Sequence, residues 1–516
     1  MIELKNVTFE YGSAEGAAGG IGETVSNGSL KNINLKINEG EFVLLTGGSG
    51  CGKTTILRLI NGLIPNFFEG KLEGSVTVDG FDVSHAELYD TAKSVSTVFQ
   101  NPRSQFFNVD TTSELAFACE NQGMEESEIL QRIDKTVSEL HLEPLMNRSL
   151  FDLSGGQKQK IACASVAVTG NKIILLDEPS ANLDLRTIDE LAGLLKRWKN
   201  EGKTIIVAEH RISYLWELAD RTVVLKKGQI ARELSRAQMD KISEEELHEL
   251  GLRSANKYCH PELVSGSNAK ETLKHRERHC EAGQKQSSGL FLASLQAAKP
   301  RRVQHDNDSF LTLQNFRYKY KNGYLALNIP QMQIPVGKIT AITGNNGDGK
   351  TTLLNCLCGL GRRSKGTLLY QGKTYNRRQR QKLIFLVMQD VNHQLFTESV
   401  LDEVLISQAE ENEEEARRIL ATLDLEQFAD RHPQSLSGGQ KQRVAVASAI
   451  ASGRDIMLFD EPTSGLDYTH MLQIGEILRS LKAQGKTVIV VTHDRELIKE
   501  CCDEEIKIRD FNNKTK

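Results

Sequence analysis

Short runs of apolar residues alternate with longer amphipathic segments along most of the chain. The runs at 173–176 (IILL), 204–208 (TIIVA) and 488–491 (VIVV) are uniformly apolar and short, so they predict buried strands. Segments with helical periodicity lie between such runs, for example at 187–200 and 471–484. Strands that alternate with helices predict a mostly parallel α/β sheet.

The same order of elements occurs in both halves of the chain. Each half opens on a β-rich segment, at 2–9 and 311–320, followed by a strand, a glycine-rich loop and a helix. A more helical and more variable middle comes next. We therefore predict, in each half, a mostly parallel core sheet accompanied by a β-rich opening and a helical middle. Residues 12–29 are rich in Gly, Ala and Ser, lack a counterpart in the second half, and predict a flexible hairpin tip.

The spacing of equivalent residues indicates a duplication. Lys53 and Lys350 lie 297 positions apart, and Gln100 and Gln389 lie 289 apart, so the first half is longer in its earlier part. The later positions keep one constant offset, which indicates two homologous domains rather than a series of short repeats. Four pairs share this offset of 283 positions: Gln157 and Gln440, Asp177 and Asp460, Asp184 and Asp467, and His210 and His493.

Composition fits soluble globular domains. The chain has 516 residues and a net charge of −4, with 26% charged and 39% hydrophobic residues. No apolar run approaches the ~18 residues that cross a bilayer, and the N-terminus lacks a basic and then apolar signal region. Nine irregularly spaced cysteines predict reduced cytosolic thiols rather than disulfides. We expect one domain at 1–250 and a second at 309–516.

The segment at 251–308 predicts a disordered, flexible linker, because it is poor in aliphatic residues and rich in Ser, Gln, Lys and Arg. Its HPELVSGS and RRVQHDN stretches resemble translated mobile repeats of some bacterial genomes, so we also consider an in-frame insertion whose deletion leaves ATP hydrolysis intact. A metal site is conceivable, although the spacing matches no standard zinc pattern. Its candidate ligands are Cys259, His260, His275, His279 and Cys280.

Two glycine-rich loops match G-x-x-x-x-G-K-[ST], in which backbone N–H groups surround phosphates and the lysine reaches the β- and γ-phosphate oxygens. Each loop precedes a predicted helix, whose N-terminus favours anions. Both loops therefore predict ATP binding. The first consists of Gly47, Gly48, Ser49, Gly50, Cys51, Gly52, Lys53, Thr54 and Thr55, and the second of Gly344, Asn345, Asn346, Gly347, Asp348, Gly349, Lys350, Thr351 and Thr352.

Hydrolysis needs a metal ion and an oriented water, and each half offers both. A threonine of the loop supplies a hydroxyl to Mg²⁺, a buried strand delivers an aspartate to the same ion, and the glutamate after it polarises the attacking water. A histidine after the next apolar strand contacts the γ-phosphate, or else is an ordinary strand-end histidine. These residues are Thr54, Asp177, Glu178 and His210 in the first half, and Thr351, Asp460, Glu461 and His493 in the second.

Cys51 lies inside the first loop, beside the N-terminus of its helix, where the pKa of a thiol tends to fall. We expect alkylation of Cys51 to block nucleotide binding at the first site alone, and ATP to protect the thiol. The alternative is that any small residue is tolerated at this position. The second loop has Asp348 in its place.

Each half also contains LSGGQ, at 153–157 and 436–440. With the loops, acids and histidines above, this segment makes the chain resemble a tandem ATP-binding-cassette (ABC) ATPase over nearly its whole length. The resemblance implies two α/β P-loop ATPase domains, each with an antiparallel β subdomain and a helical subdomain beside its mostly parallel core sheet. In that family two cassettes meet head to tail, and the signature of one completes the ATP site of the other. The resemblance implies that the Lys53 site is completed by Ser437, Gly438, Gly439 and Gln440, and the Lys350 site by Ser154, Gly155, Gly156 and Gln157.

Further site residues follow from this resemblance. Tyr11 and Tyr320 match the aromatic residue that stacks on adenine, with an ordinary strand tyrosine as the alternative. One glutamine in each half matches the residue that connects Mg²⁺ and water with the membrane partner, and one aspartate matches the loop that crosses between halves. These are Gln100 and Gln389, and Asp184 and Asp467.

The segments at 99–107 (FQNPRSQFF) and 388–396 (MQDVNHQLF) contain a second glutamine, Gln105 and Gln394. With AEHR at 208–211, they are similar to ATPases of energy-coupling-factor importers for vitamins and transition metals. The resemblance implies a membrane coupling (T-type) protein and a small substrate-binding membrane protein as partners, and a peripheral position at the cytoplasmic face of a bacterial cell membrane. The alternative for the second glutamines is a helix-capping role.

Three other classes of protein are alternatives. Tandem sugar-importer ATPases fit the length, but usually have a degraded second site and a different signature ending. Ribosome-acting tandem cassette factors have a helical, charged arm and a signature that usually ends in Glu, whereas Gln157 and Gln440 stand here. DNA-repair cassettes need a coiled coil, a zinc hook or a basic stripe, so no nucleic-acid partner is expected.

Overall fold

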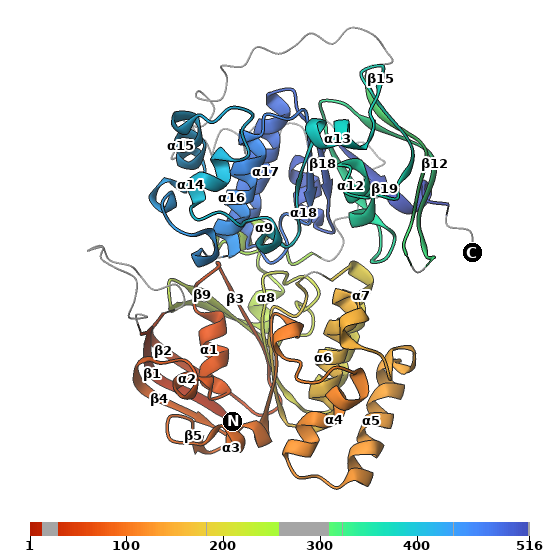
Figure 1. The fold of residues 1–516 in the computed structure, drawn as a ribbon. Helices are drawn as coiled ribbons and strands as arrows, with labels where there is room; N and C mark the ends of the chain where they lie inside the picture. Colours follow the sequence, from red (N-terminus) through yellow and green to blue (C-terminus); the bar gives the residue numbers. More distant parts are fainter. Residues whose placement is uncertain (13–28, 182, 257–308, 322, 437, 514–516) are drawn as a thin grey trace. The chain divides into compact units, whose positions relative to one another are not determined.

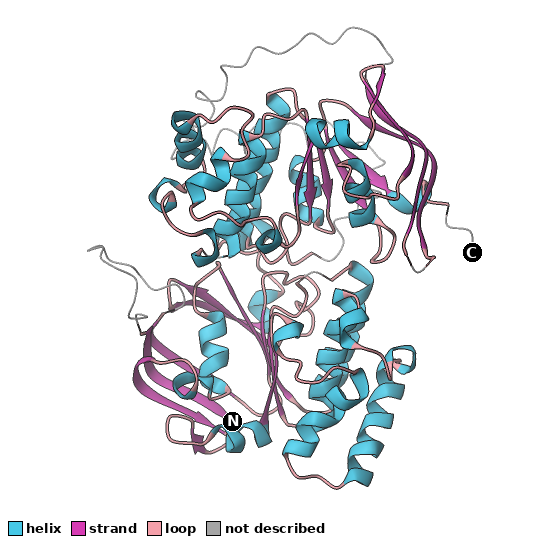
Figure 2. Ribbon diagram, viewed as in Figure 1, coloured by secondary structure: helices cyan, strands magenta, loops and turns pink. Residues whose placement is uncertain are grey.

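The computed structural model describes residues 1–12, 29–181, 183–256, 309–321, 323–436 and 438–513 (Figures 1 and 2). The chain forms two compact units, one in each half. Most of the predicted hairpin tip, and all of the metal-ligand candidates Cys259 to Cys280, lie outside the described residues. Among the residues that are described, no helix is long and apolar enough to cross a bilayer.

An antiparallel sheet begins the first half, in the strand order β2-β1-β4-β5. Ile2 of β1 pairs with Ile37 of β2 on one side and with Val78 of β4 on the other, and these residues are buried. This confirms the β-rich opening. The strands are β1 (Ile2–Tyr11), β2 (Leu30–Ile37), β4 (Gly70–Val78) and β5 (Phe81–Asp82).

The second sheet of this half is mostly parallel, as predicted, with the order β10-β9-β3-β8-β7-β6. Only the edge strand β10 runs antiparallel to its neighbour. Strands β3, β7 and β8 are buried along their whole length, which explains their uniformly apolar sequences. The strands are β3 (Phe42–Gly47), β6 (Val95–Val98), β7 (Ile173–Asp177), β8 (Thr204–Ala208), β9 (Arg221–Lys226) and β10 (Gln229–Ser235).

A helical part with its own apolar core lies beside these sheets, built mainly from α4, α5 and α6 (Figure 1). It confirms the helical middle expected from the sequence. The helices of the first half are α1 (Lys53–Ile60), α2 (Leu63–Asn66), α3 (Leu88–Ser94), α4 (Thr111–Asn121), α5 (Glu126–Leu140), α6 (Gly155–Thr169), α7 (Leu185–Asn200), α8 (Arg236–Met239) and α9 (Glu244–Glu249).

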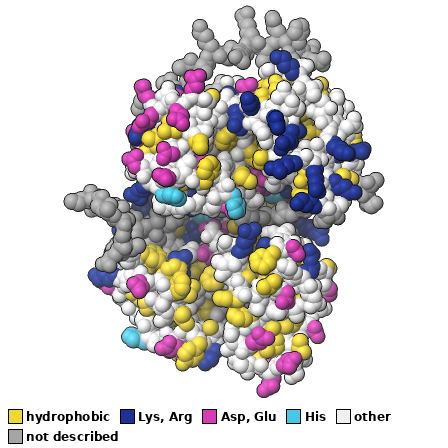
Figure 3. Space-filling model, in the orientation of Figure 1, with side chains coloured by type: hydrophobic (Ala, Val, Ile, Leu, Met, Phe, Trp, Pro, Cys, Tyr) yellow, Lys and Arg dark blue, Asp and Glu magenta, His cyan; other side chains and the backbone are white. Residues whose placement is uncertain are grey.

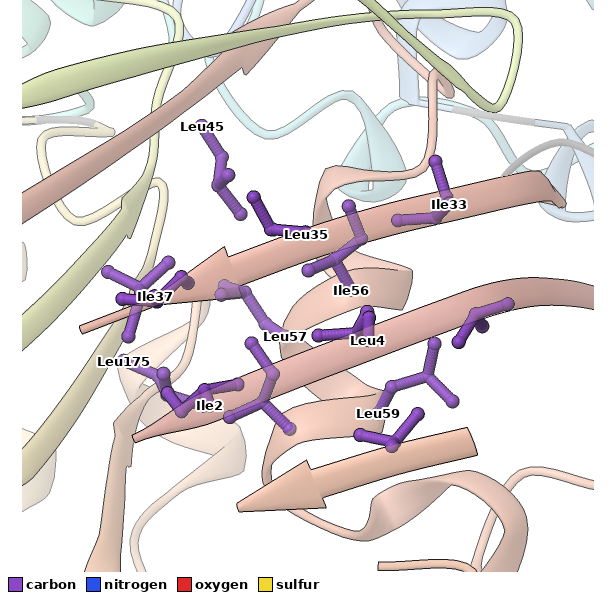
Figure 4. Packing of buried hydrophobic residues seen from close by; sticks show 14 of the residues in the cluster. Ile2, Leu4, Ile33, Leu35, Ile37, Leu45, Ile56, Leu57, Leu59 and Leu175 are labelled. Carbon is purple, nitrogen blue, oxygen red and sulfur yellow. The ribbon is translucent and has the colours of Figure 1, made fainter. Parts of the chain in front are cut away.

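The main core of the first half packs α1 between the two sheets. Figure 4 shows Ile2 and Leu4 of β1 and Leu35 of β2 facing Ile56 and Leu57 of α1. All are buried. The helix that follows the glycine-rich loop is thereby held by apolar contacts on both sides, which fixes the position of its N-terminus.

The second half repeats this plan. Its antiparallel sheet has the order β12-β11-β14-β15, and its parallel sheet has the order β16-β17-β18-β13-β19. The strands are β11 (Phe310–Lys319), β12 (Leu325–Pro335), β13 (Ile339–Thr343), β14 (Lys365–Tyr370), β15 (Lys373–Thr374), β16 (Ile384–Val387), β17 (Ile456–Asp460), β18 (Thr487–Val491) and β19 (Glu504–Lys507). The helices are α12 (Lys350–Leu357), α13 (Arg377–Leu383), α14 (Val400–Leu405), α15 (Glu413–Thr422), α16 (Gly438–Ala451), α17 (Tyr468–Ala483) and α18 (Arg495–Cys501).

Candidate ATP sites

The first glycine-rich loop joins β3 to α1. Gly47 has φ 142° and a β-carbon there would lie 2.1 Å from the carbonyl oxygen of Leu225, so only glycine fits. Gly52, with φ 106°, directly precedes α1. The loop therefore brings backbone N–H groups and the N-terminus of α1 to the carboxyl end of the parallel sheet, an arrangement that binds phosphates.

The loop lysine is buried in both halves. Lys53 Nζ donates to the carbonyl oxygens of Gly47 at 3.1 Å and Gly48 at 3.2 Å. Lys350 Nζ donates to the carbonyls of Gly344 at 2.7 Å and Asn345 at 3.1 Å. The ammonium group is thus folded back over its own loop, the position expected of a lysine that neutralises phosphate charge.

The two loops differ at three interior positions, and one of these differences pairs Cys51 with Asp348. In the second loop, the N–H of Asn345 donates to Asp348 Oδ2 at 2.7 Å, so a carboxylate braces the loop. In the first loop the equivalent residue is Cys51, which is buried. Burial raises the pKa of the Cys51 thiol, and the nearby Lys53 ammonium only partly opposes this. The expected fall in its pKa is therefore wrong, and rapid alkylation is not expected.

A carboxylate and a hydroxyl at each loop form a set of hard oxygen donors. Thr54 Oγ1 donates to Asp177 Oδ1 at 3.1 Å. Burial, followed by the neighbouring Glu178, raises the pKa of Asp177 to about 6. Burial also raises the pKa of Asp460, opposed by the Thr351 hydroxyl. Buried carboxylates of this kind are stabilised by a cation, and these donors fit Mg²⁺, which neutralises phosphate charge when bound.

Glu178 is held at the end of β7 by three groups. Its N–H donates to the carbonyl of Ala208 at 2.8 Å, and Gln100 Nε2 donates to its Oε2 at 2.7 Å. His210 Nε2 lies 3.4 Å from its Oε1. Burial favours the neutral acid, but His210 and Lys53 together with the Gln100 hydrogen bond outweigh it and lower the pKa of Glu178. The ionised carboxylate is an acceptor for a proton of an attacking water.

The second half repeats this arrangement. The N–H of Glu461 donates to the carbonyl of Val491 at 2.8 Å, and His493 Nε2 lies 3.6 Å from Glu461 Oε1. The main-chain N–H of His493 donates to Glu461 Oε2 at 3.2 Å. Sequence reasoning therefore predicted two residue pairs that the structure brings together.

His210 occupies a position between acid and base. Its Nε2 is 3.1 Å from Lys53 Nζ as well as 3.4 Å from Glu178 Oε1. A neutral ring with a free Nε2 accepts from the lysine, whereas a ring protonated at Nε2 donates to the glutamate. The histidine thus connects the loop lysine with the carboxylate at the end of β7.

Buried carboxylates that the sequence analysis missed hold the histidine loops. Glu209 accepts the N–H groups of His210 at 2.8 Å and Ser180 at 3.2 Å. In the second half the same connection is made by Asp494, which accepts from the Thr463 hydroxyl at 2.7 Å. The bracing carboxylate, Glu209, precedes the histidine in the first half, whereas Asp494 follows it in the second.

The signature serine begins α6. Ser154 Oγ accepts the N–H of Gln157 at 3.3 Å, and Gln157 Oε1 accepts the N–H of Ser154 at 3.0 Å, which is a capping box. The spacing S-x-x-Q carries that signal in the sequence. The glutamine side chain therefore stabilises the helix start whose N–H groups the resemblance assigns to ATP. Ser437 lies outside the described residues.

The signature glycines are not required by packing within the structure. A β-carbon at Gly155, Gly438 or Gly439 would meet no atom within 4 Å among the described residues. None of the three has a positive φ. Their lack of a side chain leaves the helix start open to approach by a ligand.

Two tyrosines lie close to the loops. The Tyr11 hydroxyl is 3.1 Å from Thr55 Oγ1, and the Tyr320 hydroxyl is 2.8 Å from Thr352 Oγ1. Arg58 also donates to the Tyr11 hydroxyl at 3.0 Å. Both rings are thus positioned beside the first turn of the phosphate-binding helix, and adenine stacking remains a prediction.

The second glutamines brace the segments that follow Gln100 and Gln389. Gln105 Oε1 accepts the N–H of Phe99 at 3.2 Å, and Gln394 Oε1 accepts that of Met388 at 3.1 Å. Gln105 Nε2 also donates to the Ala162 carbonyl at 3.3 Å, on α6. These side chains therefore shape a loop instead of capping a helix.

Glycine-rich loops with clustered hydroxyls and carboxylates at the carboxyl ends of parallel strands define the class of P-loop ATPases, which use ATP and Mg²⁺. The chain belongs to the ABC transporter family, whose sequence model matches residues 30–181 and 327–464, once in each half.

Curated relatives extend over the full tandem. A candidate ABC transporter ATP-binding protein of Treponema denticola is 41% identical over 503 residues, covering 97% of this chain and 94% of the relative. One of Methanosarcina mazei is 33% identical, covering 99% and 87%. A chain in a model of ribosome-bound archaeal Pelota and ABCE1 has a TM-score of 0.61 over 94% of this chain and 77% of that one. At 21% identity this likeness shows the fold alone.

Proposed function

We propose that the chain is the ATPase subunit of an energy-coupling-factor importer for a vitamin or a transition-metal ion. ATP binding and hydrolysis at two sites would act on a membrane coupling protein that carries a small substrate-binding membrane protein. The two similar segments around Gln105 and Gln394, together with AEHR at 208–211, support this branch of the family.

One observation carries the proposal that a membrane protein docks here. Phe107 is 76% exposed and Phe396 is 73% exposed, at equivalent positions of the loops that begin at Gln100 and Gln389. A single exposed apolar side chain is ordinary, so it is the repetition of this exposure at equivalent positions of both halves that supports a shared docking role. Each phenylalanine is a few residues from a glutamine that contacts, or is expected to contact, the reaction centre. Docking of a partner at this loop would therefore change the position of that glutamine in the ATP site.

Buried acids hold both phenylalanines outward. Glu114, only 3% exposed, accepts the N–H groups of Phe107 at 3.1 Å and Asn108 at 2.9 Å. Glu403, also 3% exposed, accepts those of Phe396 at 3.0 Å and Thr397 at 3.1 Å. A fixed backbone at each loop lowers the entropy cost of docking.

The signature glycines support the further proposal that each half completes the ATP site of the other. The open space at Gly155, Gly438 and Gly439 suits the approach of a phosphate to helix N–H groups. Membrane association at the cytoplasmic face would follow from docking of the exposed phenylalanines.

Purification from gently solubilised membranes, followed by mass spectrometry, tests the proposal. We expect a multi-span coupling protein and a small hydrophobic protein in stoichiometric amounts. Phe107→Glu with Phe396→Glu should release both, whereas Phe107→Leu with Phe396→Leu should retain them, because leucine preserves the apolar contact. Ribosomal proteins in their place, with no membrane protein, would refute the importer assignment.

A further inference from the structure

Two equivalent segments of the halves have opposite charge, although they share one fold. Residues 361–383 of the second half contain eight basic and no acidic residues, whereas the equivalent residues 70–94 contain two basic and five acidic ones. The catalytic residues show no such divergence. The charge difference therefore belongs to the surface of β14, β15 and α13 and not to the ATP site.

The basic residues form one patch on the second half, here called the basic patch. Figure 3 shows Lys and Arg side chains gathered where α12 and α13 lie in Figure 1, while Asp and Glu gather over α14 and α15. The exposed members are Arg362, Arg363, Lys365, Lys373, Arg378 and Lys382.

Pairing within the sheet adds to the positive charge instead of neutralising it. Arg317 of β11 lies directly opposite Lys365 of β14. The equivalent pair in the first half is Thr8 and Glu73, and Glu73 forms an ion pair with Lys71 at 2.7 Å. Like charges directly opposite in a sheet are destabilising. A sheet that retains such a pair, with no acidic side chain in residues 309–347, has a surface suited to an anion.

From these observations we propose that the basic patch binds the anionic lipid headgroups of the membrane beside the docked partner. Several lysines and arginines on one rigid face match the phosphate layer of an anionic leaflet, and each strengthens binding about fivefold. The choice of lipid over nucleic acid rests on the proposed function, which brings the chain to a membrane. The attraction is short-ranged, because charges are screened over about 10 Å at 0.1 M salt.

Vesicle flotation with the full chain tests this assignment. We expect binding to vesicles of phosphatidylcholine and phosphatidylglycerol in equal parts, no binding to pure phosphatidylcholine, and loss of binding at high salt. The patch variant R362Q/R363Q/K365Q/R378Q should bind at least about tenfold more weakly, given the contribution of each charge. Its ATP hydrolysis without membranes should be unchanged, which also shows that it folds.

Two matched variants separate the patch from net charge. R362K/R363K/K365R/R378K keeps every charge and should bind like the native chain. K31Q/K36Q/K196Q/K226Q removes the same charge from exposed positions of the first half and should also bind. Weak binding by this last variant, or native binding by the patch variant, would refute the patch as the lipid site.

A competing polyanion decides between lipid and nucleic acid. Single-stranded RNA that binds more tightly than the vesicles, with the same loss in the patch variant, would overturn the lipid assignment. The vesicles contain no protein, so their result is independent of the membrane partners. Vesicle binding without co-purifying membrane proteins would refute the importer proposal alone. Co-purifying membrane proteins without vesicle binding would refute the lipid site alone.

Discussion

Glu178 and Glu461 both adopt left-handed backbone conformations, with φ of 44° and 49°. Such conformations cost on the order of 1–3 kcal/mol for residues other than glycine and persist where the surrounding structure holds them. Here each N–H group bonds to the carbonyl of the neighbouring strand, at Ala208 and Val491. The backbone conformation therefore sets the direction of each carboxylate independently of its side-chain contacts.

Replacing either glutamate with glutamine should slow ATP turnover at least about tenfold, because loss of a general base typically costs 10²–10⁴-fold. E178Q and E461Q should still bind ATP, since the loops are untouched. Phosphate release under saturating ATP measures the effect, with E120Q at an exposed position as the control. Near-normal turnover in one variant would mean that the two sites do not contribute equally.

The raised pKa of Asp177 predicts that the stability of the fold depends on pH. Its pKa in the folded state, about 6, lies above the ordinary value of 3.8, so folding favours the protonated acid. Above pH 6 the buried carboxylate destabilises the metal-free fold by about 3 kcal/mol, and this cost disappears as the pH falls from about 6 to 4. In EDTA, D177N should unfold at a higher temperature than the native chain at pH 8, with the difference vanishing near pH 4.

A D177N variant that is less stable than the native chain at pH 8 would contradict this account. Excess Mg²⁺-ATP should reverse the order, because only the native carboxylate binds the ion.

At the scale of elements, the sequence predicts helices and strands correctly wherever the pattern that defines them is local. Uniform apolar runs correctly located β7 (Ile173–Asp177) and β8 (Thr204–Ala208), and the glycine loops correctly located the starts of α1 and α12. The braces of the histidine loops were not predictable in this way. Glu209 and Asp494 do not occupy equivalent positions of the repeat, so the constant offset hides them, and their partners are brought near only by folding.

Glu114 allows a test of loop rigidity. E114A removes the acceptor of two N–H groups, at Phe107 and Asn108, and an unsatisfied buried donor costs about 1–3 kcal/mol. Hydrogen exchange at these two amides should therefore accelerate about tenfold or more. E114Q keeps an acceptor oxygen and should restore most of the protection. Unchanged exchange in E114A would show that the loop is held by other contacts.

At the scale of the whole molecule, the signature glycines separate stability from activity. G155A and G438A should keep or raise stability, by up to about 1 kcal/mol, because alanine favours helices and the added carbon meets no atom of the described residues within 4 Å. ATP turnover should nevertheless fall, since the methyl group blocks the approach of phosphate to the helix start.

G193A is the matched control for these variants. Gly193 lies within α7, also has open space around it, and has no expected role in ATP binding. It should gain stability with full turnover. Full turnover in G155A and G438A as well would show that ATP hydrolysis does not depend on the signature glycines.

The opposite charges of the equivalent segments 70–94 and 361–383 make the two halves of a duplicated molecule distinguishable. Two identical cassettes related by a twofold axis present the same surface twice, so a partner could dock in either of two orientations. In this chain residues 70–94 are predominantly acidic and the equivalent residues 361–383 are basic, and an inverted partner would meet like charges. The repeat thus conserves the chemistry in both halves, while the divergence of their surfaces makes the two ends of the pair distinguishable to a partner that has no symmetry of its own.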